Sequence, residues 1–173
     1  DCPTDGSYTI RTNTNSCFAN TWHIVANDHT GNANGYFMLI NASVQPSAFY
    51  VDTVRGLCPN TTYEFAAWIM NVILPSACNG NANQPNITFS IEKTDGTVLQ
   101  TNTTGNISST ASPTWIQKAF LFTTTKFVIR NSQFVIRSFH CKLHIVNIQS
   151  YSLDSQIFNL LPQIPVTPTY HFQ

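Results

Sequence analysis

The stretch Asn86-Ile87-Thr88-Phe89-Ser90-Ile91-Glu92 alternates apolar and polar side chains, and Thr94-Asp95-Gly96-Thr97 follows it closely. Strict alternation places the apolar side chains on one face and the polar ones on the other, which is typical of a half-buried β-strand. The Asp-Gly pair favours a tight hairpin turn, and Val98-Leu99-Gln100 then returns. This part of the chain therefore predicts an antiparallel hairpin.

Similar strand-like segments recur along the chain, separated by Asn, Gly and Pro. No window combines a helical apolar stripe with helix caps. Many short strands with turn residues between them indicate a sandwich or barrel. We predict an all-β domain over residues 1–153, a two-sheet antiparallel β-sandwich of the jelly-roll type. Its predicted strands are Ser7–Arg11, Cys17–Val25, Tyr36–Asn41, Phe49–Val54, Thr61–Ile73, Asn86–Glu92, Val98–Gln100, Trp115–Phe122, Phe127–Ile136 and Leu143–Gln149; Ser76–Pro85 and Thr101–Pro113 are predicted as long polar loops.

The C-terminal residues 154–173 differ from the rest, because Pro162, Pro165 and Pro168 interrupt them at regular intervals. Proline donates no backbone hydrogen bond, so this segment is not expected to form a central strand. It fits an extended linker. Its apolar residues also fit an arm that adds to a neighbouring subunit as an extra strand.

The composition excludes some classes of protein. Apolar residues make up 42% of the chain, charged residues only 9%, and the formal net charge is zero. A chain without a basic patch is not expected to bind nucleic acid. No apolar run approaches the roughly 20 residues of a membrane span. Asn, Thr and Ser in place of charged residues suit an extracellular β-protein, and a chain that opens at Asp1 is expected to come from a longer secreted precursor.

Five cysteines occur without any Cys-x-x-Cys pair, which argues against zinc and favours disulfides. They are Cys2, Cys17, Cys58, Cys78 and Cys141. The first expected pair is Cys58–Cys78, which would clip the two ends of the strand Thr61–Ile73 and stabilise the fold by roughly 3 kcal/mol. Cys2–Cys17 is the second expected pair. Cys141 is then left over, either buried and free or paired across a subunit contact.

Several sequence blocks follow one another in the order found in a known family of modules: Asp28-His29-Thr30-Gly31, Asn34-Gly35-Tyr36-Phe37-Met38, Gly56–Asn71, Pro85–Phe89 and Ser112–Trp115. Together they resemble the jelly-roll module, similar to carbohydrate-binding modules and MAM domains, of large secreted adhesin- and gliding-type surface proteins of Bacteroidota. The resemblance implies an extracellular location, export by the type IX route, and adhesion or glycan contact at the cell surface.

Calcium is the one cofactor that the sequence suggests. Asp28 could supply a carboxylate, with loop carbonyls from Gly31 to Asn34 completing the oxygen shell. The alternative is that Asp28 caps its own turn. The resemblance implies a further acidic ligand near the C-terminus, where this chain has Asn147.

Aromatic side chains are the candidate ligand contacts, because the C–H faces of sugars pack on flat rings. Trp115, Trp22 and Trp68 are the candidates. Trp68 has a core alternative, since its strand is apolar on both faces. The five histidines, at positions 23, 29, 140, 144 and 171, are interpreted as structural or surface residues.

Catalysis is not expected. A glycosidase needs two carboxylates in one cleft, and Glu64 with Glu92 is the pair that could approach each other. The sequence is thus interpreted as a non-catalytic binding or adhesion module that contacts a surface glycan. The alternatives are a structural fibre or spacer subunit joined to neighbouring subunits through its tail, and an accessory domain of a polysaccharide hydrolase.

Overall fold

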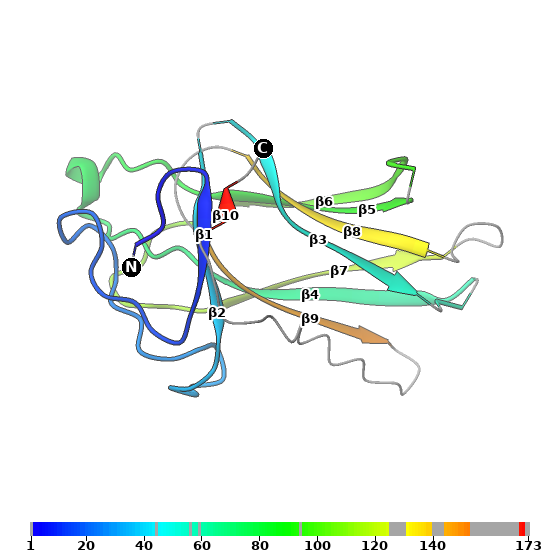
Figure 1. Cartoon of the computed structure of the whole chain (residues 1–173), viewed down its shortest axis with the longest axis horizontal. Helices are drawn as coiled ribbons and strands as arrows, with labels where there is room; N and C mark the ends of the chain where they lie inside the picture. The colour runs from blue at the N-terminus through cyan, green and yellow to red at the C-terminus, as the bar shows by residue number, and fades with distance from the viewer. Residues whose placement is uncertain are drawn as a thin grey trace.

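The computed structural model describes residues 2–43, 45–55, 57–58, 60–93, 95–124, 131–139, 144–152 and 170–171. Within these residues the chain forms ten β-strands and one short 3-10 helix (Figure 1). The elements are β1 (Ser7–Arg11), β2 (Phe37–Asn41), β3 (Ser47–Arg55), β4 (Thr62–Met70), η1 (Ala77–Gly80), β5 (Asn86–Lys93), β6 (Val98–Asn106), β7 (Ile116–Thr123), β8 (Asn131–Phe139), β9 (His144–Ser152) and β10 (Tyr170–His171).

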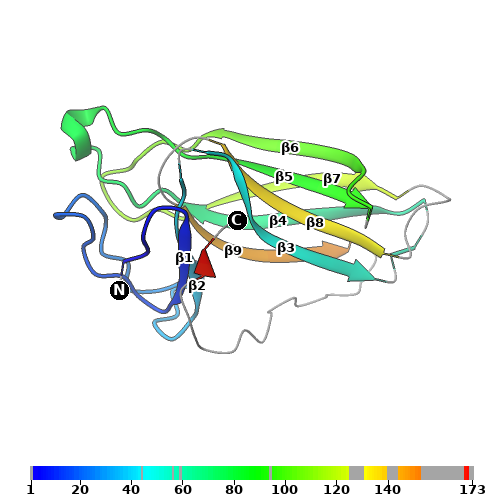
Figure 2. The ribbon, with the colours of Figure 1, turned by 45° about the horizontal axis from the view of Figure 1, so that its top comes forward.

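The strands form two sheets in which every pairing is antiparallel. The larger sheet has the order β10-β1-β2-β9-β4-β7 and the smaller one the order β3-β8-β5-β6. The two sheets lie face to face (Figure 2). Between β2 and β9 the chain passes from one sheet to the other at every step except the β5–β6 hairpin. This is the jelly-roll arrangement, and it confirms the predicted fold class.

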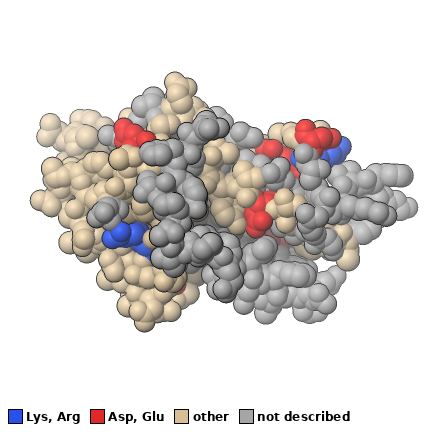
Figure 3. Space-filling view, in the orientation of Figure 1, with Lys and Arg blue, Asp and Glu red and all other residues tan. Residues whose placement is uncertain are grey.

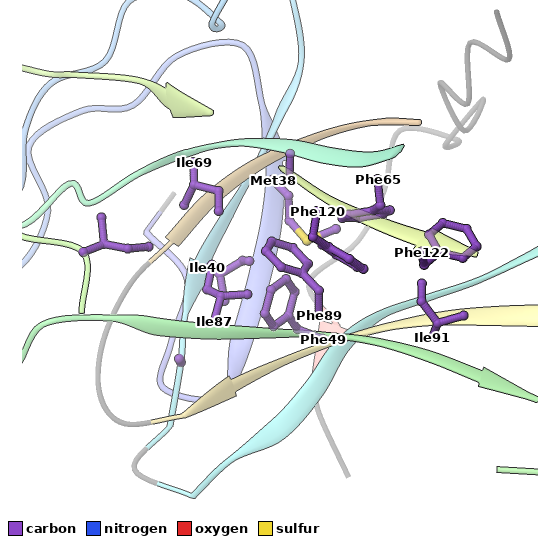
Figure 4. Packing of buried hydrophobic residues seen from close by; sticks show 13 residues of the cluster. Met38, Ile40, Phe49, Phe65, Ile69, Ile87, Phe89, Ile91, Phe120 and Phe122 are labelled. Carbon is purple, nitrogen blue, oxygen red and sulfur yellow. The ribbon is translucent and has the colours of Figure 1, made fainter. Parts of the chain in front are cut away.

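The main core lies between the sheets. It is formed by alternate side chains of each strand, because successive side chains point to opposite faces of a sheet. Ile87, Phe89 and Ile91 of β5 all face inward, as their alternation predicts. The Phe65 ring of β4 lies 5.1 Å from the Phe89 ring and 5.4 Å from the Phe120 ring of β7. These side chains close the gap between the sheets (Figure 4).

A second apolar cluster covers one end of the outer face of the larger sheet. Phe37 and Leu39 alternate along β2 with Met38 and Ile40, so they point away from the main core. Trp22 and Val25, from the segment 12–36, pack in the same cluster as Phe37 and Leu39. Figure 1 shows these loops, together with η1, at one end of the sandwich.

The predicted strand Cys17–Val25 is wrong. This segment is irregular, apart from an isolated bridge between Trp22 and Ile73. Phe18, Ala19 and Asn20 have φ angles of 48°, 54° and 63°. Three consecutive residues in the left-handed region cannot continue a strand.

The predicted loop Thr101–Pro113 begins too early, because β6 continues to Asn106. Thr103 pairs with Thr88 and Asn102 with Phe89 of β5, and the Thr103 hydroxyl lies 2.6 Å from Asn86 Oδ1. Asn and Thr side chains on both faces of an edge strand leave no apolar alternation to recognise.

The structure contains the Cys2–Cys17 disulfide, with a Cα–Cα distance of 5.9 Å. The expected Cys58–Cys78 bridge is wrong, because both are free, exposed thiols. Cys58 precedes β4, and Cys78 lies in η1 beyond its other end. A nine-residue strand spans about 30 Å, whereas a disulfide requires Cα atoms within about 7 Å. Cys141 lies outside the described residues.

The proposed linker or arm lies mostly outside the described residues. Its residues Tyr170 and His171 form β10, which pairs with Tyr8 and Ser7 of β1. In the part of the chain that the structure describes, no helix has the length and apolar character needed to cross a membrane.

Candidate functional site

The loop before β2 is organised around the Asp28 carboxylate, which is 8% exposed. Asp28 Oδ1 accepts hydrogen bonds from the Thr30 amide at 2.8 Å, the Thr30 hydroxyl at 2.6 Å and the Asn32 amide at 3.0 Å. Burial raises the pKa of Asp28, but these hydrogen bonds outweigh it and hold the pKa below its ordinary value. Asp28 is therefore ionised at neutral pH.

Gly35 closes this loop against the other carboxylate oxygen. A Cβ atom added to Gly35 would lie 2.0 Å from Asp28 Oδ2 and 2.4 Å from Asp28 Cγ. The Gly35 amide donates to the Asn32 carbonyl oxygen at 3.0 Å, which holds the backbone in this position. The carboxylate is thus enclosed by its own loop.

This geometry does not fit a calcium site. Calcium takes six to eight oxygen ligands, but Asp28 Oδ1 already accepts three hydrogen bonds and Oδ2 faces Gly35. The carbonyl oxygens of Asp28, Gly31 and Asn32 accept hydrogen bonds within the loop. Among the described residues, no three His, Cys, Asp or Glu side chains gather as metal ligands. The Asn147 backbone pairs with Trp68 in the sheet. The structure does not describe the Asn147 side chain, so its part in a calcium site stays a prediction.

We therefore expect excess EDTA to leave the melting temperature unchanged to within about 1 °C, because the hydrogen bonds of the Asp28 loop need no cation. Differential scanning fluorimetry at pH 7 measures this, with added calcium chloride as the matched arm. A melting temperature that falls with EDTA and recovers with calcium would establish the ion in spite of this geometry.

Three rings meet beside the loop on the outer face of the larger sheet. The His29 imidazole stacks on the Trp68 indole, with centroids 5.1 Å apart and planes 21° apart. Trp115 stands nearly perpendicular to His29 at 6.3 Å. All three side chains are partly exposed. We call His29, Trp68 and Trp115 the aromatic platform.

The strand pattern explains why these rings meet. Phe65, Ala67 and Ile69 of β4 point into the main core, so Trp68 projects from the opposite face. Trp115 immediately precedes β7, which pairs with β4 in the same sheet. The Trp115 ring also lies edge-on to the Phe37 ring of β2, with the two ring centroids 6.0 Å apart.

The aromatic candidates from the sequence separate in the structure. Trp68 and Trp115 lie in the platform. Trp22 is 4% exposed within the second cluster and has no ring face free for a ligand, so its inclusion is corrected. The core alternative for Trp68 does not hold either, because its side chain is partly exposed on the outer face.

His29 carries an unusual polar atom. Its Nδ1 is buried and has no hydrogen-bond partner in the described part of the structure. Burial lowers the pKa of His29, and the nearby Asp28 carboxylate offsets only part of this effect. The imidazole is therefore mainly neutral at pH 7. The sequence missed His29, because only the fold brings its loop against β4.

The two candidate catalytic carboxylates do not meet. Glu64 alternates with the core residue Phe65 and so lies on the outer face of the larger sheet. Glu92 alternates with the core residue Ile91 and so projects from the other face of the smaller sheet, where it is 4% exposed. The whole sandwich separates them, and packed sheets are about 10 Å apart, beyond the spacing of a glycosidase pair.

No protein-family model matches the chain, and no curated protein matches its sequence. A solved structure of an enzymatically active domain of tailspike protein 4 from bacteriophage CBA120 is similar, with a TM-score of 0.50 and 11% identity. The match covers 88% of this chain but 18% of the tailspike chain. The likeness is one of fold alone.

Two carbohydrate-binding modules are also similar, with TM-scores below 0.5. A CBM4 module gives a TM-score of 0.45 at 14% identity, over 66% of this chain and 71% of that chain. The CBM22-1 xylan-binding domain from Paenibacillus barcinonensis gives 0.47 at 10% identity, over 90% and 91% of the two chains.

Proposed function

We propose that this chain is a non-catalytic, extracellular glycan-binding module that contacts its ligand through the aromatic platform. The observation that carries the proposal is the meeting of three partly exposed rings on one face of a β-sheet. Aromatic rings on a rigid sheet offer apolar contact area at a small cost in side-chain entropy, and the C–H faces of a sugar ring can pack against them.

The surroundings of the platform suit a hydroxyl-rich ligand. Gln117 lies opposite Trp68 in the sheet, and its side chain is exposed. Thr114, Asn32 and Asn34 are also exposed, on the two loops that supply Trp115 and His29. Amides and hydroxyls both donate and accept hydrogen bonds, as sugar hydroxyls do.

An extracellular location is supported by the Cys2–Cys17 disulfide, because such bonds persist in oxidising compartments. The surface agrees, since charged side chains are few and scattered over the face drawn in Figure 3. Adhesion through a surface glycan would follow from the same contacts.

A glycan array probed with the labelled full chain tests the proposal. We expect at least one saturable hit. Trp115→Ala should weaken that hit about tenfold, since losing one aromatic contact corresponds to roughly 1.4 kcal/mol. The matched control is Val98→Ala, which removes an exposed apolar side chain (53% exposed) from the other sheet and should bind normally.

A blank array, or a hit that Trp115→Ala leaves unchanged in a folded protein, would contradict the proposal. The structural fibre or spacer alternative would then be favoured, and the oligomeric state of the chain with and without residues 154–173 would test it. The hydrolase accessory domain shares the binding prediction, because such a domain also binds polysaccharide.

A further inference from the structure

We propose that His29 determines the specificity of the platform: its imidazole is held as the neutral tautomer with the proton on Nε2, and this N–H donates to an oxygen of an uncharged sugar. The ligand part of this inference rests on the proposed function. The tautomer part stands on the structure of the free protein.

The buried nitrogen selects the tautomer. A neutral imidazole carries one N–H donor and one bare acceptor nitrogen, whereas the cation carries two donors. A proton on Nδ1 would be a buried N–H without an acceptor in the described structure. Folded proteins avoid orphaned N–H donors more strictly than acceptors without a partner. Both the cation and the Nδ1–H tautomer are therefore disfavoured.

The remaining nitrogen, Nε2, carries the proton in this tautomer. Nε2 is not buried as Nδ1 is, and it has no hydrogen-bond partner among the described residues. Trp68 supports one face of the imidazole, and Trp115 stands at its edge. The ring is thus fixed by packing, and its free donor is available to a sugar that contacts the same rings. A donor held in one direction discriminates between positions of the acceptor oxygen.

The charges around His29 select an uncharged sugar. The ionised Asp28 is adjacent in the chain, and its carboxylate is the charged group that raises the pKa of His29 against the effect of burial. Of the cations in this sheet, Lys118 alternates with the outward Gln117 and so projects from the opposite face. Arg11 lies opposite Phe37, whose ring is 6.0 Å from the Trp115 ring, so it neighbours the platform through Phe37 at Trp115 and not at the stacked His29 and Trp68 rings. The carboxylate of a uronate or sialic acid bound at His29 would therefore meet the negative charge of Asp28.

The tautomer is measured first, on uniformly 15N-labelled protein without any ligand. Long-range 1H–15N correlation spectra distinguish a protonated nitrogen from a bare one. We expect His29 to show a bare Nδ1 and a protonated Nε2 at pH 7, with His29→Phe identifying its signals. A protonated Nδ1 would overturn the inference, whatever the chain binds.

Two variants then separate the donor from the ring. His29→Phe keeps an aromatic ring over Trp68 but removes the donor, and should weaken the best array hit at least tenfold. His29→Gln loses the ring but keeps an N–H donor at a similar reach, and should weaken it less than His29→Phe does. Melting temperatures confirm that both variants are folded.

The outcomes distinguish this inference from the proposed function. If the wild-type chain binds and Trp115→Ala binds about tenfold more weakly, but His29→Phe binds as the wild type does, only the role of His29 is overturned. A preference for carboxylated over neutral glycans would overturn the choice of ligand. A blank wild-type array would overturn the proposed function, and with it the ligand part of this inference.

Discussion

Replacing Gly35 by alanine is expected to destabilise the protein by about 3 kcal/mol or more, which corresponds to a fall of roughly 6–12 °C in melting temperature for a chain of this size. The added Cβ atom would lie 2.0 Å from Asp28 Oδ2, far inside van der Waals contact. Asp28 cannot swing away cheaply, because Oδ1 accepts three hydrogen bonds and the residue is 8% exposed. The loop must therefore open, and it carries His29.

Gly31→Ala is the matched control in the same loop. Gly31 has a φ of +82°, but nothing lies within 4 Å of an added Cβ atom. This variant should lose only about 1 kcal/mol from backbone strain. Thermal or urea unfolding measures both variants. Equal losses would show that space at Gly35 is not limiting. Gly35→Ala should also cost less in an Asp28→Ala background, since the clash involves the carboxylate.

Removing the Cys2–Cys17 disulfide should cost about 3 kcal/mol. The bond closes a loop with a sequence separation of 15 residues, and constraining the unfolded chain over such a loop gives this magnitude in the chain-entropy model. The loop contains β1, and Cys17 is 3% exposed in the second cluster. The double variant Cys2→Ser/Cys17→Ser, measured by urea unfolding, should show the loss.

The free thiols supply the control for this experiment. Cys58→Ser/Cys78→Ser should change the free energy of unfolding by less than about 0.5 kcal/mol, because both side chains are exposed and unbonded. Dithiothreitol should lower the stability of this control and of the wild type, but not that of the Cys2/Cys17 variant. A larger loss from the Cys58/Cys78 variant would reverse this assignment of the pairing.

The sequence predicts the sandwich well, because burial of one strand face imposes a period of two that single residues reveal. This rule alone places Ile87, Phe89 and Ile91 in the core, where the structure has them. It fails where burial does not follow strand geometry. Residues 17–25 form an irregular loop whose apolar side chains pack against the larger sheet. Their apolar composition resembles that of a buried strand, so the sequence predicts a strand there.

The site was predictable only in parts. Trp68 and Trp115 are candidates because they are large aromatic residues near strand ends, but their neighbour His29 comes from a distant loop. No local pattern encodes that contact. The disulfide could have been predicted better, because the extended length of a strand already forbids a bridge between its two ends.

The position of β9 has a consequence for how the chain acquires its structure. This strand lies between β2 and β4 in the larger sheet, with Met38 opposite Val146 and Trp68 opposite Asn147. During synthesis, β2 and β4 are made long before their shared neighbour, so each keeps an open edge until β9 emerges. Contacts so distant in sequence slow folding, and open edges in the meantime invite association with other chains. Efficient folding of such a domain would favour a chaperone that holds it until β9 is available.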